Sequence, residues 1–242
     1  MKNLPIGQDS FENLIHDNCV YVDKTEYIYR ILSSGARTQF LSRPRRFGKS
    51  LLLSTIKAVF EGKRELFQGL FIEDKIDWQP HPVIKLDMTK DAGSARSLRI
   101  ALASSIMSFA EEFDVEIDYH EESPATMLER LIKLVADRTG RQLVILVDEY
   151  DKPILDVIEN PSLAAEIRRV LQDFYVVFKS SSSKIRFLML TGVSKINQLS
   201  IFSGLNQLSD LTLNTEYAGM CGYTQAELEQ YFDVYIASLG VV

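Results

Sequence analysis

The sequence has few of the residues that build disulfide frameworks or histidine metal sites. Its 242 residues include two cysteines, Cys19 and Cys221, and three histidines that no helical spacing would bring together. Two distant cysteines are too few for a disulfide-stapled scaffold or a zinc site. We therefore expect a reducing compartment, the cytoplasm, and a fold that is held together by its hydrophobic core.

Long apolar runs and an excess of positive charge are also missing. No stretch reaches the length of a membrane span, and residues 1–5 lack the apolar segment of a signal peptide. We therefore expect no membrane partner. The formal net charge of -6 does not favour a surface that coats nucleic acid, although a local basic patch is compatible with it. The hydrophobic content of 46% suffices for one substantial α/β core.

Apolar periodicity predicts strands that alternate with helices. We expect strands at 38–42, 82–88, 143–147 and 185–190, with a last one near 211–213. Helices are expected at 25–32, 51–60, 95–113, 124–139, 162–178 and 224–239, the first of them capped by Thr25. This alternation predicts an α/β fold, a mainly parallel β-sheet flanked by helices. We divide the chain into an N-terminal segment and helix (1–37), a core (38–215) and the start of a C-terminal helical lid (216–242).

The strand at 38–42 leads directly into Arg43-Pro44-Arg45-Arg46-Phe47-Gly48-Lys49-Ser50-Leu51, which opens a helix. A loop of this kind aims backbone amides and a helix N-terminus at an anion. Lys49 is placed to reach the β- and γ-phosphates of ATP, and the Ser50 hydroxyl to ligate Mg²⁺. The whole segment is thus a candidate nucleotide site. The alternative is a surface turn that carries Gly-Lys-Ser by chance.

This loop departs from the G-x-x-x-x-G-K-[ST] pattern of P-loop proteins. Arg43 stands where the first glycine is usual, and Pro44 removes one backbone amide. A side chain at that position is compatible with the loop only where the local backbone conformation tolerates it.

Two adjacent carboxylates follow the most apolar strand of the chain, at 143–147. Open α/β sheets bind their ligands at the carboxyl ends of the strands. We assign Asp148 to the metal and Glu149 to the activation of water, with Thr191 sensing the γ-phosphate from the neighbouring strand. The alternatives are ordinary solvated strand ends. Along the chain, the strand before Gly-Lys-Ser is followed by one further strand, then by the strand that ends in Asp148 and Glu149, and then by the strand that ends in Thr191. This order of strands is that of P-loop ATPases with an additional strand and a catalytic glutamate.

Several segments together point to one family. They are Leu4-Pro5-Ile6-Gly7, Tyr21-Val22-Asp23-Lys24-Thr25, Ser42 to Ser50, Phe67-Gln68-Gly69-Leu70, Asp148-Glu149-Tyr150-Asp151-Lys152-Pro153 and Leu190-Thr191-Gly192-Val193-Ser194. With these the chain resembles the bacterial AAA-ATPase-like proteins of the P-loop superfamily, which are related to archaeal ATPases. In that family the arginine at position 43 is the usual form of the loop.

The resemblance implies an ATP-binding module, which longer members of the family often join to a C-terminal domain similar to restriction-type nucleases. Residues 222–228 resemble the start of a helical lid that ends after one helix. We therefore expect the chain to be a piece of a longer protein.

Several further residues have more than one interpretation. Arg45 and Arg46 are candidates for contact with phosphate, an acidic partner or single-stranded nucleic acid, or for local ion pairs. Tyr21 and its neighbours are candidates to cover the adenine ring, although a tyrosine there is also typical of a core. Arg168 and Arg169 are candidates for an arginine finger that reaches a neighbouring subunit, although most helix arginines are solvated.

Two main functions compete. The first is Mg²⁺-dependent ATP hydrolysis coupled to conformational change or to homo-oligomer formation, which Glu149 favours. The second is an ATP-binding switch or scaffold with little turnover that regulates a C-terminal effector, a nuclease-like domain or a partner protein. The altered loop and the short lid favour this second function. A small-molecule kinase is a third class, for which the sequence shows no acceptor motif.

Overall fold

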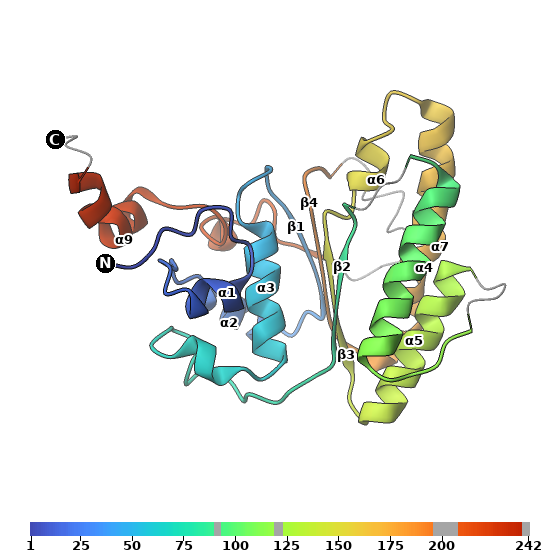
Figure 1. Ribbon diagram of the computed structural model, residues 1–242, viewed down its shortest axis with the longest axis horizontal. Helices are drawn as coiled ribbons and strands as arrows, with labels where there is room; N and C mark the ends of the chain where they lie inside the picture. Colours follow the sequence, from blue (N-terminus) through green and yellow to red (C-terminus); the bar gives the residue numbers. More distant parts are fainter. Residues whose placement is uncertain (90–92, 119–122, 196–207, 239–242) are drawn as a thin grey trace.

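The computed structural model describes residues 1–89, 93–118, 123–195 and 208–238 (Figure 1). The strands are β1 (Thr38–Ser42), β2 (Val83–Asp87), β3 (Leu143–Asp148), β4 (Ile185–Gly192) and β5 (Ser209–Asp210). The helices are α1 (Phe11–His16), α2 (Thr25–Ser33), α3 (Lys49–Phe60), α4 (Ala95–Glu112), α5 (Pro124–Thr139), α6 (Lys152–Leu155), α7 (Pro161–Ser180) and α9 (Gln225–Ser238). Short 3₁₀ turns lie at Arg64–Phe67, Ser182–Lys184 and Thr215–Tyr217.

The five strands form one parallel sheet in the order β2-β3-β4-β1-β5. Strand β4 therefore lies between β1 and β3. The register pairs Leu41 of β1 with Thr191 of β4, and Val147 of β3 with Leu190 of β4. Because parallel strands end at the same edge, the residues that follow β1, β3 and β4 meet at the carboxyl edge of the sheet.

Helices cover both faces of the sheet. Helices α1, α2 and α3 lie on one side, and α4, α5 and α7 on the other (Figure 1). All six residues of β3 are buried, and the first five alternate between the two cores. Leu143, Ile145 and Val147 belong to the core beneath α4, α5 and α7, whereas Val144 and Leu146 belong to the core beneath α3. This is the pattern of a central parallel strand, which is apolar on both faces.

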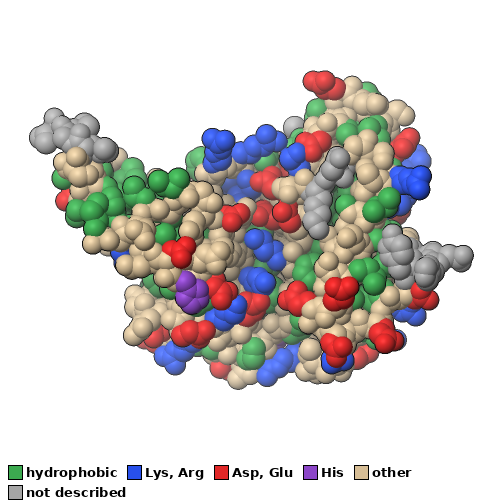
Figure 2. Space-filling model, viewed as in Figure 1, with side chains coloured by type: hydrophobic (Ala, Val, Ile, Leu, Met, Phe, Trp, Pro, Cys, Tyr) green, Lys and Arg blue, Asp and Glu red, His purple; other side chains and the backbone are tan. Residues whose placement is uncertain are grey.

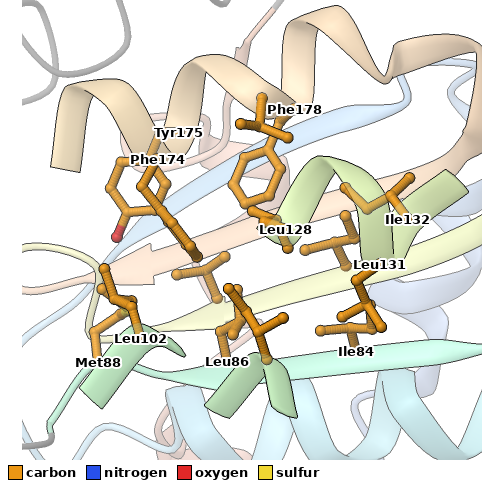
Figure 3. Close-up of a cluster of buried hydrophobic side chains, with 14 of the residues drawn as sticks. Ile84, Leu86, Met88, Leu102, Leu128, Leu131, Ile132, Phe174, Tyr175 and Phe178 are labelled. Carbon is orange, nitrogen blue, oxygen red and sulfur yellow. The ribbon is translucent and has the colours of Figure 1, made fainter. Parts of the chain in front are cut away.

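The larger core is built from interlocking aliphatic and aromatic side chains. Ile84 and Leu86 of β2 face Leu128, Leu131 and Ile132 of α5 and the aromatic rings of α7 (Figure 3). Phe174, Tyr175 and Phe178 recur at helical spacing on one face of α7, and all three are at most 2% exposed. This rigid layer supports the carboxyl ends of β3 and β4.

The α/β fold with a mainly parallel sheet is confirmed, and most expected elements lie within a few residues of their predicted ends. The strand predicted near 211–213 is wrong: β5 comprises Ser209–Asp210. The Asp210 side chain accepts a hydrogen bond from the Thr212 amide at 2.9 Å, which turns the chain out of the strand direction. The predicted helix end at Leu239 lies outside the described residues.

Near the N-terminus one local prediction is corrected and one helix is new. Thr25 is the first helical residue of α2 rather than its cap, and the Asp23 carboxylate accepts from the Thr25 amide at 2.8 Å. Helix α1 was not predicted, because its single turn and a half is too short for an apolar period to show. Phe11 and Leu14 bury its one apolar side.

Candidate functional site

The loop after β1 ends in a glycine whose backbone conformation is left-handed. Gly48 has φ 90° and caps the N-terminus of α3, a conformation that disfavours a side chain. Helix α3 begins at Lys49, two residues before the predicted start, so the first amides of the helix face the loop. These amides carry the positive end of the helix dipole and form a site for an anion.

Lys49 joins this loop to the end of β3. Its side chain is almost fully buried, and its Nζ lies 3.2 Å from the carbonyl oxygens of both Arg43 and Pro44. Nζ also lies 3.1 Å from Oε1 of Glu149. Lys49, which follows β1 in the sequence, and Glu149, which follows β3, are therefore in direct contact.

Asp148 and Thr191 form a buried pair at the ends of β3 and β4. The Thr191 hydroxyl donates a hydrogen bond to Oδ1 of Asp148 at 2.8 Å. Thr191 is fully buried and Asp148 is 5% exposed. Thr191 at the end of β4 thus orients the carboxylate of Asp148 at the end of β3.

Glu149 has an unusual backbone and an unsatisfied oxygen. Its φ is 52°, in the left-handed region that residues with a Cβ seldom adopt. Of its two carboxylate oxygens, Oε1 faces Lys49, whereas Oε2 is buried without a hydrogen-bond partner in the described part of the chain. An acceptor of this kind is available to a water molecule or a ligand in the adjoining cavities.

The Arg43 side chain is used within the protein. Its guanidinium donates to the carbonyl oxygens of Ser42 at 3.0 Å, Thr212 at 2.9 Å and Tyr217 at 3.1 Å. The arginine that replaces the first loop glycine therefore attaches the loop to the segment after β5. Its own backbone carbonyl faces Lys49.

Two adjoining cavities lie at the carboxyl edge of the sheet, where acidic and basic side chains gather around a hollow (Figure 2). The larger has a volume of about 790 Å³ and a partly apolar wall that includes Tyr21, Val22, Phe47, Met220 and Tyr223. The smaller, of about 480 Å³, is polar and is lined by Arg45, Lys85, Asp87, Asp148 and Lys152, among others. Asp9, Ser50 and Glu149 line both cavities.

The described residues contain no cluster of three or more His, Cys, Asp or Glu side chains that could by itself hold a metal ion. Ser50 and Asp148 nevertheless line the same polar cavity. Mg²⁺ commonly takes one or two protein oxygens and completes its shell with waters and the phosphates of a substrate. These two residues fit that arrangement.

Other predicted residues are distributed unevenly around the cavities. Arg45 lines the polar cavity and Arg46 the larger one. Tyr21 fits both of its interpretations, since it lines the larger cavity and also packs edge-on against Phe11 with ring centroids 4.9 Å apart. Arg168 and Arg169, the arginine-finger candidates on α7, line neither of the two cavities.

Sequence reasoning missed the wall that residues 220–223 contribute. The Gly222 amide donates to the Phe47 carbonyl at 3.0 Å, which attaches this wall to the loop. Burial raises the pKa of the Cys221 thiol to about 11, so it lines the cavity as a neutral group. Lys24 lines the cavity as well and forms an ion pair with Glu227 of α9. No local sequence pattern predicts these contacts, because they join residues that are far apart in the chain.

Among the helices that the structure describes, none is both long and apolar enough to cross a membrane.

Comparisons with known proteins identify the family of the chain. A family model described as "Predicted AAA-ATPase" matches residues 5–202. A curated protein of Azotobacter chroococcum mcd 1, described as an uncharacterized protein in the vnfD 5' region, is 38% identical over 234 residues. The match covers 96% of this chain and 45% of that relative, so the chain spans less than half of the relative's length. Because the family model covers most of the chain, from before α1 to beyond β4, the protein belongs to the family of predicted AAA-ATPases.

Proposed function

We propose that the protein binds ATP with Mg²⁺ and hydrolyses it, and that hydrolysis is coupled to a conformational change. One observation carries the proposal. Lys49 of the loop and Glu149 of β3 are 3.1 Å apart at the junction of a polar and a partly apolar cavity. A triphosphate nucleotide needs both environments, since its base is apolar and its phosphates are charged.

The proposed binding mode follows the two cavities. The adenine ring lies in the larger cavity, where Tyr21, Phe47 and Tyr223 offer aromatic surface. The backbone of residues 43–51 surrounds the phosphates, and Lys49 exchanges its two carbonyl contacts for phosphate oxygens. Charged phosphate oxygens are stronger acceptors than neutral carbonyls, so this exchange is favourable.

Ser50 and Asp148 are the proposed protein ligands of Mg²⁺, with Asp148 acting through water. The ion, when bound, neutralises charge on the phosphates. Thr191 holds Asp148 in place through their 2.8 Å hydrogen bond, and this orientation is its main proposed role. The sequence also suggested that Thr191 senses the γ-phosphate. We propose that it does so through this hydrogen bond to Asp148.

Glu149 is the proposed general base. Once the phosphates attract Lys49, both carboxylate oxygens of Glu149 can accept hydrogen bonds from a water molecule near the γ-phosphate. Oε2 already lacks a partner in the described part of the protein. Glu149 then takes the proton of the attacking water, and the resulting nucleophile displaces ADP from the γ-phosphoryl group.

The second candidate is an ATP-dependent switch with little turnover that regulates a further domain or a partner. The ion pair between Lys24 of the cavity wall and Glu227 of α9 favours it, because it links the nucleotide cavity to the end of the described chain. The relative, of which the chain covers 45%, has room for such a domain.

A paired measurement separates the two candidates. Calorimetric titration with ATP in the presence and absence of Mg²⁺ reports binding, and phosphate release reports turnover on the same sample. Mg²⁺-dependent binding with steady release supports the hydrolase. Tight binding without release supports the switch, and the absence of binding refutes both. Candidate acceptors added to the release assay test for a kinase.

A further inference from the structure

The turn after β3 holds Glu149 in a conformation that needs outside support. Its φ of 52° is unfavourable for a residue with a Cβ, and such conformations persist only where the surrounding structure enforces them. They are common at functional sites, where they aim a side chain. The contacts of the next two residues, Tyr150 and Asp151, supply the enforcement.

Asp151 is a fully buried carboxylate that accepts hydrogen bonds from backbone amides. Its Oδ2 accepts from the Ser194 amide at 2.7 Å, and both of its oxygens lie 3.2 Å from the Val193 amide. These amides belong to the two residues that follow the end of β4, just beyond Thr191. Asp151 therefore fastens the turn after β3 to the chain after β4.

Tyr150 adds two further hydrogen bonds between the turn after β3 and the end of β4 with the residues that follow it. Its amide donates to the Thr191 carbonyl at 2.9 Å, and its hydroxyl donates to the Ser194 carbonyl at 2.7 Å. Burial, with a smaller contribution from the Asp151 carboxylate, raises the pKa of the phenol, so the hydroxyl remains a donor.

Gly192 allows the two segments to approach this closely. A Cβ at position 192 would lie 2.5 Å from the ring of Tyr150 and 2.6 Å from Oδ1 of Asp151. Real Cβ atoms essentially never come so near to other heavy atoms. The glycine, the tyrosine and the buried acid therefore form one connection between the strand ends.

We propose that Asp151 is a positioning residue for hydrolysis, which rests on the proposed function of this site. By joining the turn after β3 to residues 193 and 194, it keeps Glu149 in its left-handed conformation and in contact with Lys49. Asp148 has its own 2.8 Å hydrogen bond with Thr191, which does not involve Asp151. Asp151 lines neither cavity, so it acts through Glu149 and not on the nucleotide itself.

The kinetic test uses Asp151→Asn, which keeps the shape of the side chain but removes its charge and replaces one acceptor oxygen with an NH₂ group, which then faces the Val193 amide, itself a donor. We expect kcat to fall on the order of ten- to a hundredfold, the scale of a misplaced catalytic group. The Kd for Mg²⁺-ATP should stay within about threefold, because the loop is unchanged. Ser123→Ala, which removes the side-chain cap of α5, is the control for a simple loss of stability. It should leave kcat at the parental value.

A double-mutant cycle tests whether Asp151 acts through Glu149. In a Glu149→Gln background, Asp151→Asn should lower the residual rate by less than about twofold, because the group that it positions is already removed. An equal loss in both backgrounds, or a parental kcat for the folded single variant, would overturn the proposal.

A structural readout separates this proposal from the proposed function. In crystals without nucleotide, Asp151→Asn should move Glu149 out of the left-handed region and lengthen its 3.1 Å contact with Lys49. Unchanged geometry overturns the positioning role, whereas failure of the parent to bind ATP refutes only the proposed function. If Asp151→Asn does not fold, Tyr150→Phe removes one bond of the connection, and a parental kcat for that variant also overturns the proposal.

Discussion

At the scale of single residues, the site depends on a few side chains that the fold holds in unusual settings. Lys49 is buried against two carbonyls and one carboxylate, and Glu149 has a left-handed backbone. Neither setting is favourable for an isolated residue, since a buried amine requires acceptors and a Cβ resists positive φ. Settings of this kind are commonest where a protein does chemistry.

The Lys49→Ala variant should bind ATP roughly ten- to a hundredfold more weakly, because hydrogen bonds to charged groups contribute about 1.5–3 kcal/mol. Calorimetry measures the change. Lys57→Ala is the matched control, since Lys57 lies on the same helix but pairs with Glu61 at the surface. Equal affinities in the parent and the folded Lys49→Ala variant would show that this loop is not the nucleotide site.

The adjacent acids should respond differently to neutral substitution. Glu149→Gln keeps the shape and removes the base, so we expect retained Mg²⁺-ATP binding and about a hundredfold loss of turnover. Asp148→Asn should instead weaken the Mg²⁺-dependent part of ATP binding. Phosphate release and calorimetry on both variants test this division. Parental turnover in Glu149→Gln would favour the switch over the hydrolase.

At the scale of elements, α9 is the helix that the rest of the chain holds least. None of its residues is buried, and it lies apart from the sheet, beside the N-terminus (Figure 1). Glu227 attaches it to the cavity wall, because one carboxylate oxygen pairs with Lys24 while the other accepts from the Thr224 amide at 2.8 Å. The Tyr235 hydroxyl attaches it to the N-terminus by donating to the Lys2 carbonyl. Lys24 therefore connects the cavity wall directly to α9.

We expect Glu227→Gln to loosen α9 and to speed limited proteolysis within residues 225–238 by several-fold. The substitution removes the charge that partners the buried Lys24, while its length still allows a bond to the Thr224 amide. Glu229→Gln is the control on the same helix, since Glu229 accepts from the Gln225 side chain at the surface. Equal cleavage of the two variants would exclude the attachment.

The attachment also has a defined pH range. Burial alone would raise the pKa of Glu227, but the hydrogen bonds from Lys24 and Thr224 outweigh it, and the pKa falls below its ordinary 4.5. A carboxyl whose pKa is lowered by folding stabilises the folded form above the unfolded value and loses this contribution as the pH falls through the folded one. The same proteolysis assay should therefore show α9 attached at pH 7 and loosened below pH 4.5.

At the scale of the whole molecule, nucleotide binding should stabilise the folded protein. A ligand at a hundred times its Kd adds about 2.7 kcal/mol, which for a chain of this size raises Tm by roughly 5–10 °C. Thermal unfolding followed by circular dichroism, with and without Mg²⁺-ATP, measures the shift. The shift should be small in Lys49→Ala at the same nucleotide concentration. A full shift in that variant would place the binding site elsewhere.

The sequence by itself determined most of the elements and which polar residues stand at their ends. These features are local patterns, which depend only on residues close together in the sequence. Examples are the apolar run of β3, the helical spacing in α5 and α7, and Gly48-Lys49-Ser50 at the start of α3. The candidates Lys49, Ser50, Asp148, Glu149 and Thr191 could be named for this reason, although their roles remain predictions.

The tertiary structure decided how distant segments meet, because local periodicity carries no information about contacts between remote residues. The pairing of Lys49 with Glu149 and the wall at residues 220–223 depend on such contacts. So do the attachment of Arg43 to residues 212 and 217 and the connection from Asp151 to residues 193 and 194. The sheet order β2-β3-β4-β1-β5 brings these segments to one edge, and burial there favours hydrogen bonds between them.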